Sequence, residues 1–160
     1  MRLIMATLAA WTLAAAAQAQ SVTLTGLDGQ SRTVTAADLA AMPRETLSLR
    51  TEAGKQIRYE GVPLTLLLQS VGAPAGKALR GPALDDIVVV AAKDGYHVAL
   101  ALADTDAGMR AEKVLLADRA DGAPLSAQDG PFRLVVEGDL RGARSARMVT
   151  SIIVERAPAP

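Results

Sequence analysis

The chain has 160 residues, no cysteine and a formal net charge of +0, because 17 basic residues balance 17 acidic ones. This length suits one domain with a single packed core, and the lack of cysteine excludes disulfides, thiolate nucleophiles and thiolate metal ligands. The balanced charge, with only one tryptophan, two tyrosines and one phenylalanine, argues against nucleic acid or an anionic membrane as the partner.

The first 19 residues have the three parts of a cleavable signal peptide. They are a basic start at Met1-Arg2, an apolar run from Leu3 to Ala16, and a small-x-small cleavage site at Ala17-Gln18-Ala19. A membrane anchor is the alternative, but this run is shorter than the roughly 20 residues that cross a bilayer. We therefore expect cleavage after Ala19, a periplasmic protein, and no membrane insertion after cleavage.

The export route and the domain limits follow from the same segment. The signal contains a single arginine rather than an adjacent pair, which favours the route that threads unfolded chains over the twin-arginine route for folded cargo. The mature chain is expected to form one domain over residues 20–156, followed by a flexible tail over 157–160.

The first half of the domain is predicted to contain two strand pairs and two short helices. Polar-apolar alternation and turn residues indicate the strands, which are 21–26, 31–35, 46–50 and 56–59. Thr35 is expected to cap a helix over 36–42. The second helix is predicted over 61–72, because Pro63 lies near its first turn and Gly72 follows its last. The leucines of this helix are expected in the core.

The second half of the domain is predicted to be almost entirely strands. After a loop over 73–83, strands are expected at 87–92, 96–102, 113–117, 132–136 and 148–154. The first two of these are expected to pair across the turn at Asp94-Gly95. With no internal repeat, the sequence predicts a β-rich α+β domain with two short helices.

His97 is the only histidine, which excludes sites that need two imidazoles and leaves a hydrolytic triad without its usual base. It is expected to be a partly buried, hydrogen-bonded strand residue; a single proton donor in a pocket is the alternative.

Asp104 to Gly108 resembles the start of a calcium loop. However, the glycine comes one residue early and Leu115 stands where the closing glutamate is needed, so we expect no calcium there.

Arginines cluster near the end of the chain, at Arg133, Arg141, Arg144 and Arg147. Guanidinium groups brought together in this way can bind a phosphate or carboxylate through paired hydrogen bonds. The alternative is that they are solvated side chains that balance nearby acidic residues, namely Asp129, Glu137 and Asp139.

Several segments, taken in order, resemble the molybdopterin-binding domain of sulfite oxidase-type oxidoreductases. They are Tyr59–Leu64, Asp94–Tyr96, Leu115–Ala117, Asp121–Leu125, Asp129–Gly138 and Gly142–Val149. The resemblance runs from Val22 to about Glu155 and implies the fold of that domain. It also implies that Arg144 and Arg147 match residues that hold the cofactor's phosphate, and that Arg133 matches the arginine of the family's glycine-proline turn.

The chain also departs from this family. The family's molybdenum takes a cysteine thiolate, a soft ligand suited to that metal, and the matching stretch here is Leu47 to Glu52, which has no thiol. The family's longer N-terminal segment with its cofactor contacts is missing from the match, and its Lys-Trp pair is Arg147-Met148 here. Exported enzymes of the family take up the cofactor before crossing the membrane and use a twin-arginine signal.

These observations predict a periplasmic, cofactor-free binding or accessory module without catalytic activity of its own. Its candidate site comprises Arg133, Arg144 and Arg147, and its partner is a small anionic ligand or a periplasmic or membrane protein. The alternatives are a molybdopterin-dependent oxidoreductase whose metal has an oxygen ligand from Ser48 or Thr51, and a partner subunit of a redox complex.

Overall fold

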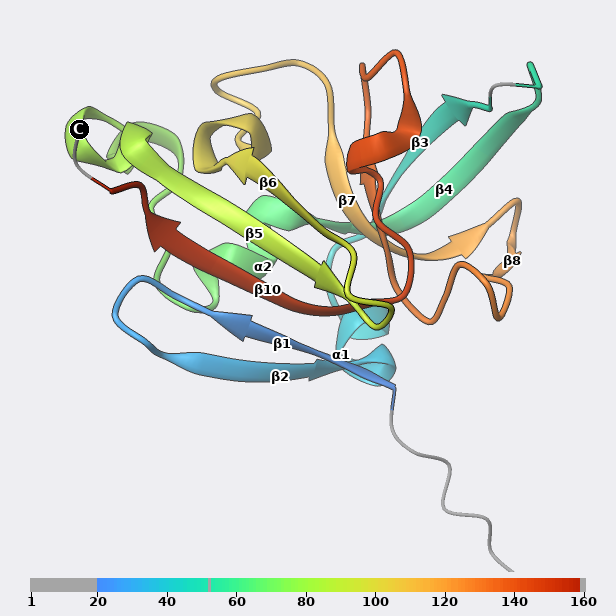
Figure 1. Ribbon diagram of the computed structural model, residues 1–160, viewed down its shortest axis with the longest axis horizontal. Coiled ribbons are helices and arrows are strands. Elements are labelled where there is room, and N and C mark those ends of the chain that lie inside the picture. The colour runs from blue at the N-terminus through green and yellow to red at the C-terminus, as the bar shows by residue number, and fades with distance from the viewer. Residues whose placement is uncertain (1–19, 52, 159–160) are drawn as a thin grey trace, which may run out of the picture.

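The structure is a computed structural model, and it describes residues 20–51 and 53–158. Its first sheet has the strand order β2-β1-β10-β5-β6 (Figure 1). The strands are β1 (Ser21–Thr25), β2 (Ser31–Thr35), β5 (Asp86–Ala92), β6 (His97–Ala101) and β10 (Val149–Arg156). β1 runs parallel to β10, whereas all other neighbours in this sheet are antiparallel. The predicted hairpins β1–β2 and β5–β6 are both confirmed.

The second sheet has the order β3-β4-β7-β8, and β9 also pairs with β7. Its strands are β3 (Glu45–Arg50), β4 (Gln56–Pro63), β7 (Val114–Ala120), β8 (Ala123–Pro124) and β9 (Arg133–Val136). Among the residues that the structure describes, β3 pairs with β4 alone and therefore forms one edge of this sheet.

Within residues 20–51 and 53–158, two short α-helices and four 3-10 turns complete the fold. The α-helices are α1 (Ala36–Ala41) and α2 (Leu64–Gln69), and the 3-10 turns are η1 (Gly76–Ala78), η2 (Gly81–Asp85), η3 (Leu102–Thr105) and η4 (Gly142–Arg144). Thr35 caps α1 as predicted, in a capping box with Asp38, whose backbone N–H donates to the Thr35 hydroxyl at 3.2 Å.

The prediction that the second helix begins at Gly61 is wrong. Gly61 to Pro63 continue β4, because β7 pairs with this strand as far as the partners Pro63 and Leu115. Pro63 has an extended backbone (φ −52°, ψ 130°) and lies at the N-cap of α2. The leucines that follow are in the core as expected, with Leu64, Leu67 and Leu68 all buried.

Apolar residues on both faces of the second sheet form two separate clusters. The large cluster packs the first sheet and both helices against one face, where Leu116, Leu134 and Phe132 are fully buried. The small cluster lies on the other face and consists of Leu47, Tyr59, Leu115, Ala117 and Val135. Adjacent residues of β7 thus belong to different clusters, as the alternation of side chains along a strand requires.

Three predictions about polar and terminal residues can be compared with the structure. His97 is exposed rather than partly buried, because its strand is at the sheet edge and its side chain points away from the core. Asp106 of the rejected calcium loop accepts hydrogen bonds from the backbone N–H groups of Gly76 and Gly108. At the predicted tail, the N–H of Ala157 donates to the Asp85 carbonyl at 3.0 Å. The predicted signal peptide lies outside the described residues.

Candidate functional site

An open cleft of about 1050 Å³ lies between the edge strand β3 and the loop of residues 138–147. This volume is at the top of the range of roughly 300–1,000 Å³ typical of ligand pockets. Residues 48–51 of β3 and its turn form one wall, and the 138–147 loop, which includes η4, forms the other. The remaining lining residues are Ile57, Tyr59, Asp94, Tyr96, Arg133 and Val136.

The floor of the cleft combines apolar side chains with a stacked arginine. Leu49 and Ile57 are partly buried beside Tyr59, which is only 4% exposed, and burial raises the pKa of the Tyr59 hydroxyl. The Arg133 guanidinium lies 5.2 Å from the centre of the Tyr59 ring, within the range of a cation–π contact. Its Nη1 donates to Asp129 Oδ1 at 2.8 Å, whereas its buried Nε has no partner among the described residues.

The walls of the cleft carry an excess of positive charge. Four arginines line it against two aspartates, which are Asp94 and Asp139. Arg50, Arg141 and Arg147 are exposed and have no ion pair with any residue that the structure describes. Although the whole chain is neutral, the cleft is therefore locally basic and suited to an anionic group.

The backbone next to Arg147 adopts an unusual conformation. Met148 has a φ of 49°, in the left-handed region that residues other than glycine rarely occupy. Two backbone hydrogen bonds hold it there, since its N–H donates to the Asp129 carbonyl at 3.0 Å and its carbonyl accepts from Lys93 at 2.9 Å. This turn connects the loop that carries Arg147 to β10.

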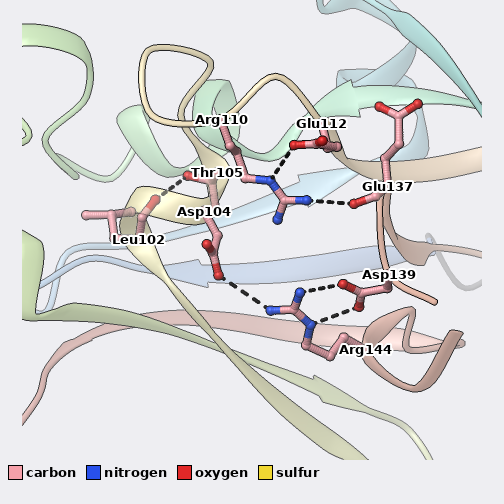
Figure 2. A network of polar contacts seen from close by, with 8 residues as sticks. All are labelled: Leu102, Asp104, Thr105, Arg110, Glu112, Glu137, Asp139 and Arg144. Carbon is pink, nitrogen blue, oxygen red and sulfur yellow. Dashed lines mark hydrogen bonds and ion pairs between the residues drawn. The ribbon is translucent and has the colours of Figure 1, made fainter. Parts of the chain in front are cut away.

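Arg144 does not line the cleft and is already paired with two carboxylates (Figure 2). Its Nε donates to Asp139 Oδ2 at 2.9 Å, and its Nη1 lies 3.4 Å from Asp104 Oδ2 on η3. The hydrogen bond with Arg144 lowers the pKa of the Asp139 carboxyl, and the same bond raises the pKa of Arg144. Arg144 therefore joins the 138–147 loop to η3.

Tyr96 provides a second attachment for the same loop. It lies in the turn between β5 and β6, and its hydroxyl donates to the Ala143 carbonyl at 2.7 Å. Because Ala143 precedes Arg144 directly, the loop is fixed from two sides at nearly the same point. These two attachments hold the part of the loop between Arg141 and Arg147 against the rest of the fold.

The structure brings together part of the predicted site. Arg133 and Arg147 both line the cleft, together with Ser48 and Thr51 from the stretch that matches the family's cysteine region. Arg133 and Arg144 also form the ion pairs with Asp129 and Asp139 expected of surface arginines. Sequence reasoning missed Tyr96, which belongs to a segment that carries the family resemblance, and Arg50, which lies in the stretch that departs from the family.

The described residues offer neither a cluster suited to a metal ion nor a membrane-spanning helix. Within residues 20–51 and 53–158, no group of three or more histidine, aspartate or glutamate side chains is arranged to hold a metal ion. No helix in the same residues is long and apolar enough to cross a membrane. His97 is not among the residues that line the cleft.

Comparison with known proteins identifies the fold and the family. A solved structure with this fold is the sulfane dehydrogenase SoxCD from Paracoccus pantotrophus, with a TM-score of 0.64 and 21% identity over 84% of this chain. The chain spans only 38% of that protein's chain. No curated protein matches the sequence. The sequence profile of the oxidoreductase molybdopterin binding domain matches residues 9–160, and the chain therefore belongs to the oxidoreductase molybdopterin binding domain family.

Proposed function

We propose that this chain is an exported, non-catalytic binding module that holds an anionic group in the cleft between β3 and the 138–147 loop. The observation that carries the proposal is the convergence of Arg50, Arg141 and Arg147, which have no ion pair among the described residues, on one cleft. Guanidinium groups bind carboxylates and phosphates through paired, charge-assisted hydrogen bonds. The predicted signal peptide supports a periplasmic location.

The family's molybdopterin fits one half of this cleft and not the other. Arg133, Arg141 and Arg147 offer suitable donors for the phosphate of the cofactor. The family's molybdenum, in contrast, takes a cysteine thiolate, a soft ligand, and the stretch that lines the cleft opposite these arginines provides the hydroxyls of Ser48 and Thr51 but no thiol. The residues present thus support anion binding and do not complete the metal site, and we propose no redox step.

A second candidate function is a molybdopterin-dependent oxidoreductase with an oxygen ligand on its metal. Family membership and the position of Ser48 and Thr51 on the cleft support this alternative. A third is a partner subunit that lends the domain to a redox complex. Metal analysis separates the alternatives: we expect protein purified from the periplasm to contain no stoichiometric molybdenum, and about one molybdenum per chain would favour the oxidoreductase.

Titration calorimetry with inorganic pyrophosphate tests the anion site directly. We expect weak binding by the wild type that weakens further with added salt, because exposed charges are screened over about 8 to 10 Å at ordinary ionic strength. The double variant Arg141→Ala, Arg147→Ala should bind at least about tenfold more weakly, through the loss of two charge-assisted contacts.

Arg80→Ala is the matched control, since Arg80 is exposed, has no ion pair among the described residues and lies outside the cleft. It should bind pyrophosphate like the wild type. Equal binding by the double variant and the wild type would show that the cleft arginines are surface charges only.

A further inference from the structure

The outer edge of β3 has no strand partner in the described part of the chain. The N–H of Thr51 donates to the Lys55 carbonyl at 2.8 Å and closes the β3–β4 hairpin. Hydrogen-bonded pairs alternate along an antiparallel ladder, so Leu49 and Leu47 bond to β4 through their partners Ile57 and Tyr59. The backbone N–H and C=O groups of Thr46, Ser48 and Arg50 consequently point away from β4.

The cleft meets β3 along this unpaired edge. Four consecutive residues, 48–51, line it, and successive side chains of a strand point to opposite faces. A cleft over one face of the sheet would contact only alternate residues. The cleft therefore borders the edge of β3 itself, where the outward backbone groups of Ser48 and Arg50 are located.

The opposite side of the cleft is a strand edge that is already covered. β9 pairs with β7 on one side. On its other side the N–H of Leu134 donates to the Ala146 carbonyl at 2.8 Å, and the N–H of Val136 donates to Ser145 Oγ at 3.1 Å. Ser145 and Ala146 both line the cleft. The cleft is thus a gap between one paired edge and one unpaired edge, and its walls carry the exposed Arg141 and Arg147.

We infer that an acidic, extended segment of a partner protein binds in this gap as an additional strand on β3. The inference rests on the proposed anion site and specifies that the anionic groups are carboxylates of a polypeptide. Strand addition supplies affinity through main-chain hydrogen bonds and selectivity through alternate side chains. Acidic residues at every second position face one side, where they reach the arginine wall, while the backbone between them pairs with Ser48 and its neighbours.

The peptide side of the test uses a blocked eight-residue peptide in which glutamate alternates with threonine. Two isomers are compared, one N-methylated at the glutamate amides and the other at the threonine amides. Only one alternate set of N–H groups can donate to β3. We therefore expect one isomer to lose about tenfold or more in affinity, through two or three lost hydrogen bonds, while the other binds like the unmodified peptide in calorimetry.

The protein side of the test uses Ser48→Pro, which removes an outward N–H without removing a bond to β4. Proline is tolerated on edge strands. The matched control is Thr33→Pro on β2, an edge strand of the other sheet. The backbone N–H and C=O groups of Thr33 also point away from the neighbouring strand β1. The N–H of Gly26 donates to the Gln30 carbonyl, and hydrogen-bonded pairs alternate along the β1–β2 ladder from this pair. We expect Ser48→Pro to weaken peptide binding about fivefold or more, and Thr33→Pro to leave both peptide and pyrophosphate binding unchanged.

The outcomes separate this inference from the proposed function. If both methylated isomers bind equally and Ser48→Pro has no effect, while the double variant Arg141→Ala, Arg147→Ala still weakens pyrophosphate binding at least about tenfold, the anion site stands and strand addition is wrong. If neither the peptide nor pyrophosphate binds the wild type, both proposals are wrong. Thermal melting of each proline variant establishes that it is folded, and the isomer comparison on the wild type needs no variant.

Discussion

Arg144 illustrates how a neighbour distant in sequence decides the role of a charged residue. Its position in the family pattern predicts a contact with an anionic ligand, yet the structure pairs it with Asp139, five residues earlier, and with Asp104 on η3. The Asp139 pairing is visible in the sequence as a nearby opposite charge. The Asp104 contact cannot be read from the sequence, because it depends on how η3 packs beside the 138–147 loop.

We predict that Arg144→Ala destabilises the protein by about 0.5 to 1 kcal/mol, the upper part of the range for partly exposed ion pairs. The measurement is chemical denaturation at neutral pH. Arg147→Ala, which removes an exposed arginine without an ion pair among the described residues, is the control and should change the free energy of unfolding by less than about 0.5 kcal/mol.

The same pair makes this difference depend on pH. The bond to Arg144 lowers the pKa of Asp139 in the folded protein below its ordinary value of 3.8. A depressed folded pKa contributes stability that is present above the unfolded pKa and is lost as the pH falls through the folded one. The stability gap between the wild type and Arg144→Ala should therefore shrink below about pH 4. A gap that stays constant down to pH 2 would contradict the role of this pair.

At the residue scale, sequence reasoning located part of the site. Arg133 and Arg147 were predicted from the family pattern, and both line the cleft. Arg50 and Tyr96 were missed for different reasons. Arg50 lies in the stretch that departs from the family pattern, so the resemblance assigns it no role. The role of Tyr96 depends on a contact with Ala143, 47 residues away, which no local pattern contains.

At the element scale, β4 shows why the boundary of the second helix was misplaced. Proline near the first turn and glycine after the last are typical of a helix, but they do not reveal that β7 pairs with residues 61–63. The close approach of β4 to β7 depends on Gly61, where an added Cβ would lie 2.2 Å from the Leu116 carbonyl oxygen. The ladder shifts register at this point, between Glu60 and Gly61.

We predict that Gly61→Ala destabilises the protein by about 3 kcal/mol, near the upper end of the range for overpacking, because the obstructing atoms belong to the backbone and cannot rotate away. Gly142→Ala is the control, since an added Cβ there meets no atom within 4 Å. Denaturant unfolding measures both, and similar stabilities for the two variants would mean that β4 and β7 are further apart than described.

A second prediction at this scale concerns the attachment of the 138–147 loop. Tyr96→Phe removes the hydrogen bond to the Ala143 carbonyl, so the loop that carries Arg141 and Arg147 is less well ordered before binding. We expect pyrophosphate affinity to fall about two- to fivefold, the cost of ordering a few side chains, with little change in melting temperature.

Thr150→Val tests whether this effect is specific to the loop. It removes a comparable exposed hydrogen bond, from the Thr150 hydroxyl to the Ala91 carbonyl, and lies outside the cleft. An equal loss of affinity in this variant would assign the effect to general loosening of the fold.

At the scale of the whole molecule, the α+β class and most strands were predictable because alternation and turn residues are local signals. The arrangement of the strands was not. The parallel pairing of β1 with β10 and the apolar cluster around Tyr59 on the second face of sheet β3-β4-β7-β8 both arise from long-range contacts. The cleft exists because this topology brings β3 and the 138–147 loop together. These two walls are far apart in the sequence, so local patterns do not show that they face each other.

The predicted signal peptide is also a property of the whole chain. We expect protein expressed with its own N-terminus in a Gram-negative host to appear in the periplasmic fraction and to begin at Gln20, because Ala17-Gln18-Ala19 is a small-x-small cleavage site. Intact-mass spectrometry measures the processed end, and exported protein that retains Met1 to Ala19 would show this prediction to be wrong.

The position of β10 also determines when the molecule can fold. β10 lies between β1 and β5. The β1–β2 hairpin is synthesised first and therefore has no neighbouring strand to pair with until β10 has been made. Contacts this distant in sequence form slowly. If the chain is exported unfolded and amino end first, as its single-arginine signal predicts, the first sheet can close only after β10 has crossed the membrane. A product that stops before Val149 leaves two separate hairpins, β1–β2 and β5–β6. We expect such truncated chains to remain open to proteases.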